Sequence, residues 1–338
     1  MKFPFYNGEG IRQGDESPTK LPFSKRSQLL RPEKYIADQG LKDACNVALL
    51  LGQPLLLTGE PGTGKTQFAT NLAWELGLDP PLKFEIKSTS TARDLFYTYD
   101  ALKRFQNIQS RISSAESEPL NYITYQALGL AILKTRDPAE VKEFLSPESQ
   151  HTSKSRSVVL IDEMDKAPRD FPNDLLNELE HLYFRIPELK NEKIEADPTI
   201  QPIVIITSNS EKDLPDAFLR RCIYYNIPFP TRERLQEIIA NHLEIKAESS
   251  QFLHDAIDLF YILRDPQNGL RKKPATAELL GWLLTLEGFR QGQEKFLTQS
   301  DIFARTLSSL IKTTEDQEKA YKIVEQWINK QSIKPQIG

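Results

Sequence analysis

The octet G-E-P-G-T-G-K-T at residues 59–66 constrains this chain more than any other feature. The largely apolar run Pro54–Thr58 precedes it and is typical of a fully buried strand. The stretch from Gln67 to Leu76 follows, with apolar residues at helical spacing on one face. Strand, glycine-rich turn and helix are the context in which the pattern G-x-x-x-x-G-K-[ST] is specific. The segment therefore predicts a phosphate-binding loop.

Different groups of this loop are expected to bind different parts of a nucleotide. Backbone N–H groups of the loop and of the following helix converge on one point, which suits a phosphate. Lys65 brings a positive charge to the β- and γ-phosphates, and the Thr66 hydroxyl is a ligand for Mg²⁺. We therefore expect ATP and Mg²⁺ here, although the choice between ATP and GTP depends on the base pocket. The residues expected to contact the nucleotide are Gly59, Glu60, Pro61, Gly62, Thr63, Gly64, Lys65, Thr66 and Gln67.

Composition excludes several classes of protein. The 338 residues suit one large domain and a smaller one, and 43 Lys and Arg against 47 Asp and Glu give a formal net charge of −4. That balance does not favour nucleic acid or an anionic membrane as the main partner. We find no apolar run long enough to span a bilayer and no apolar signal segment, so we expect a cytoplasmic protein. Two cysteines cannot build a disulfide framework, and Trp74, Trp282 and Trp327 are expected in the core.

The periodicity divides the chain into three parts. Residues 1–33 show no sustained period and predict an N-terminal arm. Residues 34–230 alternate helical stretches with short apolar strands, which predicts an α/β domain on a parallel sheet, and residues 231–338 predict an all-helical domain. The expected strands are Pro54–Thr58, Leu82–Lys87, Ser157–Asp162, Pro202–Thr207 and Cys222–Ile227. The expected helices of the last part are Thr231–Leu243, Ser249–Leu263, Pro274–Phe289, Asp301–Thr313 and Thr314–Lys330.

Two segments interrupt the alternation within the α/β domain. Residues 88–156 resemble an insertion grafted on the core, with helices expected at Asn121–Lys134 and Pro138–Leu145. Residues 183–201 contain short alternating segments on either side of Lys190 and predict a β-hairpin.

Two acids end the third expected strand. The run V-V-L-I-D-E at 158–163 places Asp162 and Glu163 at the carboxyl end of a buried strand, the edge where parallel sheets collect ligands. Asp162 is predicted to hold Mg²⁺, directly or through water, and Glu163 to polarise the attacking water. Acids after a strand also occur in ordinary loops, but the phosphate loop a hundred residues earlier favours the metal and water roles.

An asparagine and two arginines follow the fourth strand. Asn209 either donates to the γ-phosphate and orients the water, or caps the turn that follows it. Arg220 and Arg221 end a short helix before the last strand. They are either solvated residues at a helix C-terminus or a rigidly held cation that reaches the γ-phosphate of a neighbouring subunit.

These elements occur in the order found in the AAA+ ATPases, which the chain resembles. Four blocks are similar to the MoxR branch of that family: T-G-E-P-G-T-G-K-T, D-E-M-D-K-A-P-R-D, I-T-S-N-S-E-K-D-L-P-D-A-F-L-R-R-C and K-K-P-A-T-A-E-L-L. The similarity extends over about residues 33–290, but only the motif blocks are specific.

The resemblance implies a sheet of order 5-1-4-3-2, an α-helical lid domain and a ring, usually a hexamer, with active sites between subunits. Residues 59–66 then match the Walker A motif, Asp162 and Glu163 the Walker B motif, and Asn209 the sensor 1 position. Arg221 best matches the finger that acts on the neighbour, with Arg220 as its competitor. The resemblance also implies adenine contacts at Ile36 and Ala37, next to Tyr35, an insert at residues 88–109, and a hairpin before sensor 1.

The chain departs from the MoxR pattern at the sensor 2 position. These proteins commonly place an arginine just after a proline at the start of a lid helix, whereas Ala275 follows Pro274 here. Either Arg271 or Lys273 takes this role, or the three cations of Arg271–Lys273 form a solvated turn and the role is missing.

Four functions fit the sequence. The first is an ATP-driven remodelling or chaperone-like ring that acts on a protein client, in this family often together with a von Willebrand factor A protein. A nucleic-acid motor, a nucleotide-gated scaffold in a multi-protein assembly such as a defence system, and a nucleotide kinase are the alternatives. The near-neutral charge argues against the motor, the intact Asp162 and Glu163 against the scaffold, and Asn209 with the arginine pair against the kinase.

Overall fold

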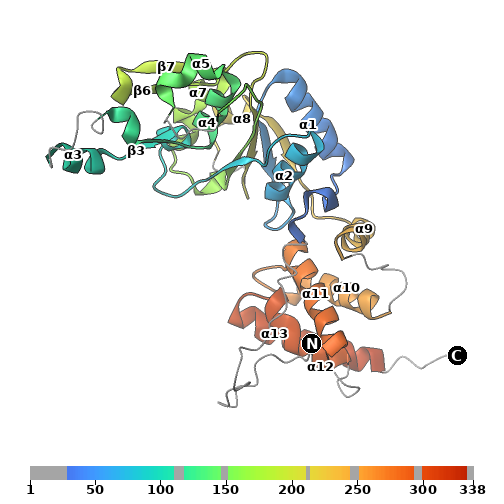
Figure 1. The fold of residues 1–338 in the computed structure, drawn as a ribbon. Coiled ribbons are helices and arrows are strands. Elements are labelled where there is room, and N and C mark those ends of the chain that lie inside the picture. Colours follow the sequence, from blue (N-terminus) through green and yellow to red (C-terminus); the bar gives the residue numbers. More distant parts are fainter. Residues whose placement is uncertain are drawn as a thin grey trace, which may run out of the picture. The chain divides into compact units, whose positions relative to one another are not determined.

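The computed structural model describes residues 29–109, 118–145, 151–210, 214–243, 251–292 and 299–332. Most of the expected arm, residues 1–28, lies outside these ranges. The chain forms two compact units (Figure 1), one of residues 35–229 and one that contains the described residues up to Lys34 and from Pro230 onward. Within the described ranges we find no helix with the length and apolar character needed to cross a bilayer.

A five-stranded parallel sheet is the centre of the first unit. Its strands lie in the order β2-β5-β8-β1-β9, which reads 5-1-4-3-2 from the β9 edge when only the five strands of this sheet are counted along the chain. The expected order is therefore confirmed. The strands are β1 (Leu55–Thr58), β2 (Leu82–Glu85), β5 (Val158–Asp162), β8 (Ile203–Thr207) and β9 (Ile223–Asn226).

Helices pack on one face of this sheet, where they contact alternate residues of β1. Leu55 and Leu57 belong to a core cluster with residues of α1 (Gln39–Leu51) and α2 (Lys65–Glu75), whereas Leu56 lies in a second cluster on the opposite face. Asp38 caps the N-terminus of α1, and its carboxylate accepts the N–H of Leu41 at 2.9 Å. The buried face of α2 holds Phe68, Ala69, Leu72 and Ala73.

The structure corrects one expectation about burial. Trp74, near the end of α2, is 54% exposed, so its expected place in the core is wrong. β2 and β9 are the edges of the sheet and alternate between half-buried and exposed residues, whereas β1 and β5 are buried throughout. Successive side chains of a strand point to opposite faces of the sheet, so one face of each edge strand is less covered than the other.

Part of the segment between β2 and β5 belongs to the core, which corrects the expectation of an insertion grafted on it. Its helix α4 (Ala127–Thr135) is buried on most sides and packs against β2 and β5, as a crossover helix between parallel strands does. The helix expected from Asn121 begins only at Ala127, because Ile123–Tyr125 form a strand, β4, that pairs antiparallel with β3 (Tyr97–Tyr99). The remaining elements here are η3 (Ala92–Leu95), α3 (Ala101–Gln109), η5 (Pro119–Tyr122), α5 (Pro138–Val141) and η6 (Lys142–Phe144).

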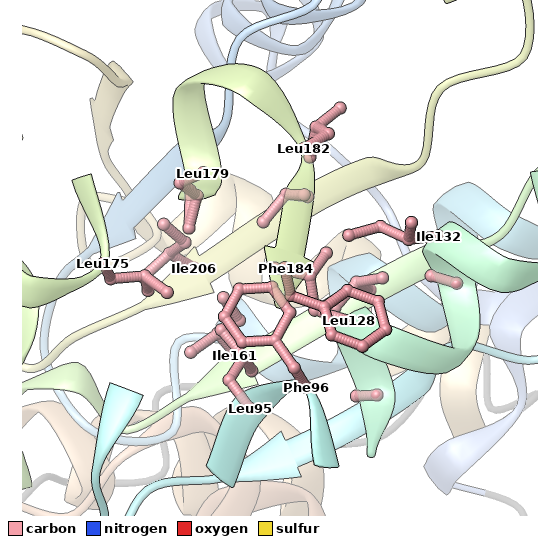
Figure 2. Packing of buried hydrophobic residues seen from close by; sticks show 14 of the residues in the cluster. Leu95, Phe96, Leu128, Ile132, Ile161, Leu175, Leu179, Leu182, Phe184 and Ile206 are labelled. Carbon is pink, nitrogen blue, oxygen red and sulfur yellow. The ribbon is translucent and has the colours of Figure 1, made fainter. Parts of the chain in front are cut away.

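The expected hairpin at 183–201 is present as β6 (Tyr183–Ile186) and β7 (Glu192–Glu195), joined through η8 (Pro187–Leu189). Phe184 of β6 packs into the second core cluster (Figure 2), where its ring stacks on Phe96 with centroids 5.4 Å apart. The hairpin is therefore anchored to this core cluster by an aromatic contact. Between β5 and β6 lie η7 (Met164–Lys166), α6 (Phe171–Asp174) and α7 (Leu176–His181), and α8 (Asp216–Leu219) precedes β9.

The second unit is helical, as its periodicity predicts. Trp282 is fully buried there, and its indole N–H donates to the Thr306 hydroxyl at 2.8 Å, which ties two helices together. Asp316, also fully buried, accepts the backbone N–H groups of Arg271 and Lys272. The elements are η2 (Pro32–Lys34), α9 (Arg232–Leu243), α10 (Gln251–Arg264), η10 (Pro266–Asn268), α11 (Thr276–Gly292), α12 (Gln299–Leu310) and α13 (Thr314–Ser332).

Candidate active site

The loop between β1 and α2 has a backbone that only glycine adopts easily. Gly59 and Gly64 have φ angles of 137° and 94°. A Cβ atom at Gly59 would lie 2.6 Å from the carbonyl oxygen of Ile227, so the loop also needs glycine for space. These two positions hold the loop at the carboxyl end of β1, against the start of α2.

Lys65 lies inside the loop rather than in solvent. It is 7% exposed, and its ammonium group donates to the carbonyl oxygens of Gly59 at 2.8 Å and Glu60 at 3.0 Å. A third bond, of 3.1 Å, goes to Oδ1 of Asn209 at the end of β8. Burial lowers the pKa of Lys65, although the charges of Asp165 and Asp162 act in the opposite direction. The loop thus holds a cation at its centre.

Asp162 is buried at the end of β5 and accepts hydrogen bonds from three sides. Its Oδ1 accepts the hydroxyls of Thr66 at 3.0 Å and Thr207 at 2.5 Å, and its Oδ2 forms an ion pair with the ammonium of Lys83 at 2.8 Å. Burial alone raises the pKa of this carboxyl, but the bonds from Lys83, Thr207 and Thr66 outweigh it and hold the pKa below its usual value. The structure therefore brings the two expected metal ligands, Thr66 and Asp162, into contact.

Glu163 follows in a left-handed backbone conformation, with φ 65° and ψ 48°. A non-glycine residue in this region stores strain, and such strained residues cluster at active sites. The backbone N–H of Glu163 donates to the Thr207 hydroxyl at 3.1 Å, which fixes the turn, and its carboxylate accepts from Lys166 at 2.5 Å. The turn separates the side chains of two successive acids, so that each has its own lysine.

Asn209 contacts both Lys65 and Asp165. Its amide oxygen accepts from Lys65, while its side-chain nitrogen and its backbone N–H both donate to the Asp165 carboxylate. The structure thus joins the end of β8 to the phosphate loop, and the role of Asn209 toward a nucleotide stays a prediction.

The arginine pair is held by other contacts. Arg221 donates from Nε to the carboxylate of Glu180 at 2.7 Å and from a terminal nitrogen to the carbonyl oxygen of Ala217 at 3.0 Å. The neighbouring Arg220 is exposed. Two hydrogen bonds therefore fix the direction of the Arg221 guanidinium.

The segment expected to contact adenine lies beside the phosphate loop. A Cβ atom at Gly64 would come within 2.9 Å of the Tyr35 ring, and that ring lies 6.0 Å from the ring of Phe68 on α2. Ile36 and Ala37 follow Tyr35 directly and are half-buried. Their contact with a base stays a prediction.

The candidates for sensor 2 belong to the helical unit. Arg271 pairs with Glu315 at 3.0 Å, and Lys273 is exposed. The assignment of this role to Lys273 or Arg271 stays a prediction.

Four residues of the site were not recognised in the sequence: Lys83, Asp165, Lys166 and Thr207. Lys83 lies on β2, which the expected sheet order places beside β5. Glu85 pairs with Asp162 in this sheet, and Lys83 is two residues before Glu85. The sheet order together with this register would therefore have brought Lys83 near Asp162. Asp165 and Lys166 lie in the block D-E-M-D-K, but a turn of this shape has no sequence signature beyond the block itself. Among the described residues, no group of three or more His, Cys, Asp and Glu is arranged to hold a metal.

Replacing Lys83 by methionine should destabilise the protein by about 1 kcal/mol at pH 7, because a buried carboxylate loses its charged donor. We expect the lower end of the usual range, since the Lys83 side chain is 43% exposed. Asp162 has a lowered pKa in the folded protein, so its stabilising contribution is present above the unfolded pKa and is lost as pH falls through the folded value. Urea unfolding from pH 7 to pH 3 should therefore show the difference shrinking below about pH 4.

Exposed Lys87, four residues along the chain, is the matched control for that experiment. Lys87→Met should leave the free energy of unfolding within about 0.5 kcal/mol of the unmodified protein. Equal effects of the two substitutions, or a Lys83→Met effect that is independent of pH, would contradict the assigned ion pair.

A comparison with known protein families assigns this chain to one of them. A family model described as AAA domain (dynein-related subfamily) matches residues 54–222, half of the chain. Domain III of the replication initiation protein DnaA from Thermotoga maritima is a similar solved structure, with 13% sequence identity and a TM-score of 0.42 over 84% of this chain and 98% of that one. No curated protein sequence matches the chain. The matched segment runs from Pro54, just before β1, to Cys222, and so includes the phosphate loop, Asp162, Glu163 and Asn209. This chain therefore belongs to the AAA domains of the dynein-related subfamily.

Proposed function

We propose that this protein binds ATP with Mg²⁺ and hydrolyses it at the cluster described above. Two direct hydrogen bonds carry the proposal. Lys65 donates to Asn209, and Thr66 donates to Asp162, so that residues from three parts of the chain meet at one place. Hydrolysis needs a cation for the phosphates, an oxygen site for the metal and a carboxylate for the water. All three are present within one edge of the sheet.

The residues fit a magnesium ion. The Thr66 hydroxyl and the Asp162 carboxylate are the hard oxygen donors that Mg²⁺ prefers, and this carboxylate already accepts from one cation, Lys83. When bound, the ion neutralises charge on the phosphate oxygens. Lys65 would then bind the β- and γ-phosphates, backbone N–H groups of residues 59–66 would hold the phosphate chain, and Ile36 and Ala37 would contact the base.

Glu163 takes the role of the base in this proposal. It accepts a proton from the attacking water, while Asn209 orients that water or donates to the γ-phosphate. In the structure the Lys166 ammonium donates to the Glu163 carboxylate at 2.5 Å. When water is activated, either this ion pair has to open or the carboxylate has to accept from both Lys166 and the water. Arg221 stabilises the charge on the γ-phosphate of the neighbouring subunit, with Arg220 as the competitor for that role.

We further propose that the protein acts as a MoxR-type remodelling ring, a hexamer by analogy, on a protein client and together with a von Willebrand factor A protein. The motif blocks and the formal charge of −4 support a protein client over nucleic acid. On α3, Leu102, Phe105 and Ile108 are spaced three residues apart and are 68%, 57% and 51% exposed. An exposed apolar helix face of this kind suits contact with another protein.

The test is steady-state hydrolysis by the purified chain. We expect ATP turnover that saturates with ATP, stops when EDTA removes Mg²⁺ and does not change when DNA is added. Absence of turnover at protein concentrations that support assembly would contradict the enzymatic proposal. Stimulation by DNA would instead favour the nucleic-acid motor.

A further inference from the structure

Asp165 is an acid of this site that has no role in the reaction proposed for it. It lies on η7, three residues after Asp162, and is half-buried. Its Oδ1 accepts the backbone N–H of Asn209 at 3.0 Å, and its Oδ2 accepts the side-chain nitrogen of Asn209 at 3.1 Å. One carboxylate therefore holds both the main chain and the side chain of Asn209.

Packing does not fix the Asn209 side chain, because the residue is exposed. Its orientation is set by its partners instead. The nitrogen faces a carboxylate, which only accepts, and the oxygen faces the Lys65 ammonium at 3.1 Å, which only donates. Reversing the amide would place donor against donor at Lys65 and acceptor against acceptor at Asp165. The hydrogen bonds thus allow one orientation.

We propose that Asp165 is a positioning residue that fixes the Asn209 amide for ATP hydrolysis. The proposal rests on the proposed function above. Asp165 takes one of the two side-chain N–H groups of Asn209, and the other is the donor that the γ-phosphate or the attacking water requires. Because the turn that carries Asp165 begins at Glu163, the same turn positions the base and the amide.

An Asp165→Asn variant separates positioning from simple packing, since it keeps the size of the side chain. Its amide oxygen still accepts the backbone N–H of Asn209, but its NH₂ group now faces the NH₂ group of Asn209. Asn209 must then reverse, which places its nitrogen against the Lys65 ammonium. The side chain remains in place, yet the orientation required for hydrolysis is lost.

We expect Asp165→Asn to lower kcat at least tenfold and to leave the Kd for ADP within about threefold, because ADP has no γ-phosphate for Asn209 to contact. Fluorescent ADP titration and steady-state hydrolysis measure the two quantities. Exposed Asp170, whose side chain does not cap α6, is the matched control, and Asp170→Asn should change neither. A kcat within twofold of the unmodified protein, or a loss of ADP affinity as large as the loss of kcat, would overturn the proposal.

A reciprocal exchange, D165N with N209D, tests the contact in the nucleotide-free protein. The amide at 165 then donates to the carboxylate at 209, accepts its backbone N–H, and leaves one carboxylate oxygen for Lys65. Asp165→Asn should lower Tm by about 2–4 °C and the exchange should restore it, while kcat stays low because position 209 lacks an amide N–H. Failure of the exchange to restore Tm would sink the assigned geometry. If the unmodified protein hydrolyses no ATP, the proposed function fails, and this Tm comparison still decides on the contact.

Discussion

Replacing Glu163 by glutamine is expected to lower kcat for ATP hydrolysis by about 10² to 10⁴, the usual contribution of a general base, while ATP still binds. Glutamine keeps the shape of the side chain and of the strained turn but does not accept a proton from water. The residues expected to hold the phosphates, Lys65 and the loop from Gly59, do not contact the Glu163 side chain through any bond described above. Binding and turnover should therefore separate in this variant.

The measurement combines steady-state hydrolysis with titration of a fluorescent ATP analogue. Glu192→Gln, on the exposed strand β7 of the hairpin, removes the same charge away from the phosphate loop and is the control. That variant should hydrolyse ATP at the normal rate. Turnover by Glu163→Gln close to that of the unmodified protein would remove Glu163 from the mechanism, and a parallel loss of ATP binding would show that it supports the loop instead.

The sheet could be predicted from the sequence because its buried strands are short apolar runs with polar residues at their ends. β1, β5 and β8 all read in this way, and the acids and the asparagine that follow them meet at one edge. Parallel strands impose that meeting, since their carboxyl ends lie on the same side. Fold class and the central site residues therefore follow from local pattern.

Contacts that depend on register or on a turn could not be predicted in the same way. Ile123–Tyr125 look like the start of a helical stretch, and only pairing with Tyr97–Tyr99, more than twenty residues earlier, makes them a strand. Lys83 reaches Asp162 from the next strand, and Asp165 reaches Asn209 across 44 residues of chain. Each of these contacts needs a three-dimensional neighbour that periodicity does not specify.

The second large effect is expected for Arg221→Ala, if each subunit needs a residue of its neighbour for ATP hydrolysis. Arg221→Ala should lower kcat by about 10³ to 10⁵ if the guanidinium stabilises the γ-phosphate of a neighbour. The fold should survive, because the bond from Arg221 to Glu180 is an exposed ion pair, which solvent screens. Arg220→Ala is the matched control, since it removes the same charge one position earlier. If Arg220→Ala loses ATP hydrolysis while Arg221→Ala hydrolyses ATP at the normal rate, Arg220 rather than Arg221 has this role.

Mixing Arg221→Ala subunits with Glu163→Gln subunits then tests whether the site is shared. An Arg221→Ala subunit keeps its own Glu163, and a Glu163→Gln neighbour supplies the missing guanidinium, so one kind of interface in the mixture is complete. In a random equal mixture about a quarter of the interfaces are of this kind, and hydrolysis should recover to a comparable fraction of the normal rate. The recovery should disappear on dilution, because it depends on assembly. No recovery at any concentration, or a normal rate for the unmodified protein as a dilute monomer, would mean that each chain completes its own site and that Arg221 acts within it.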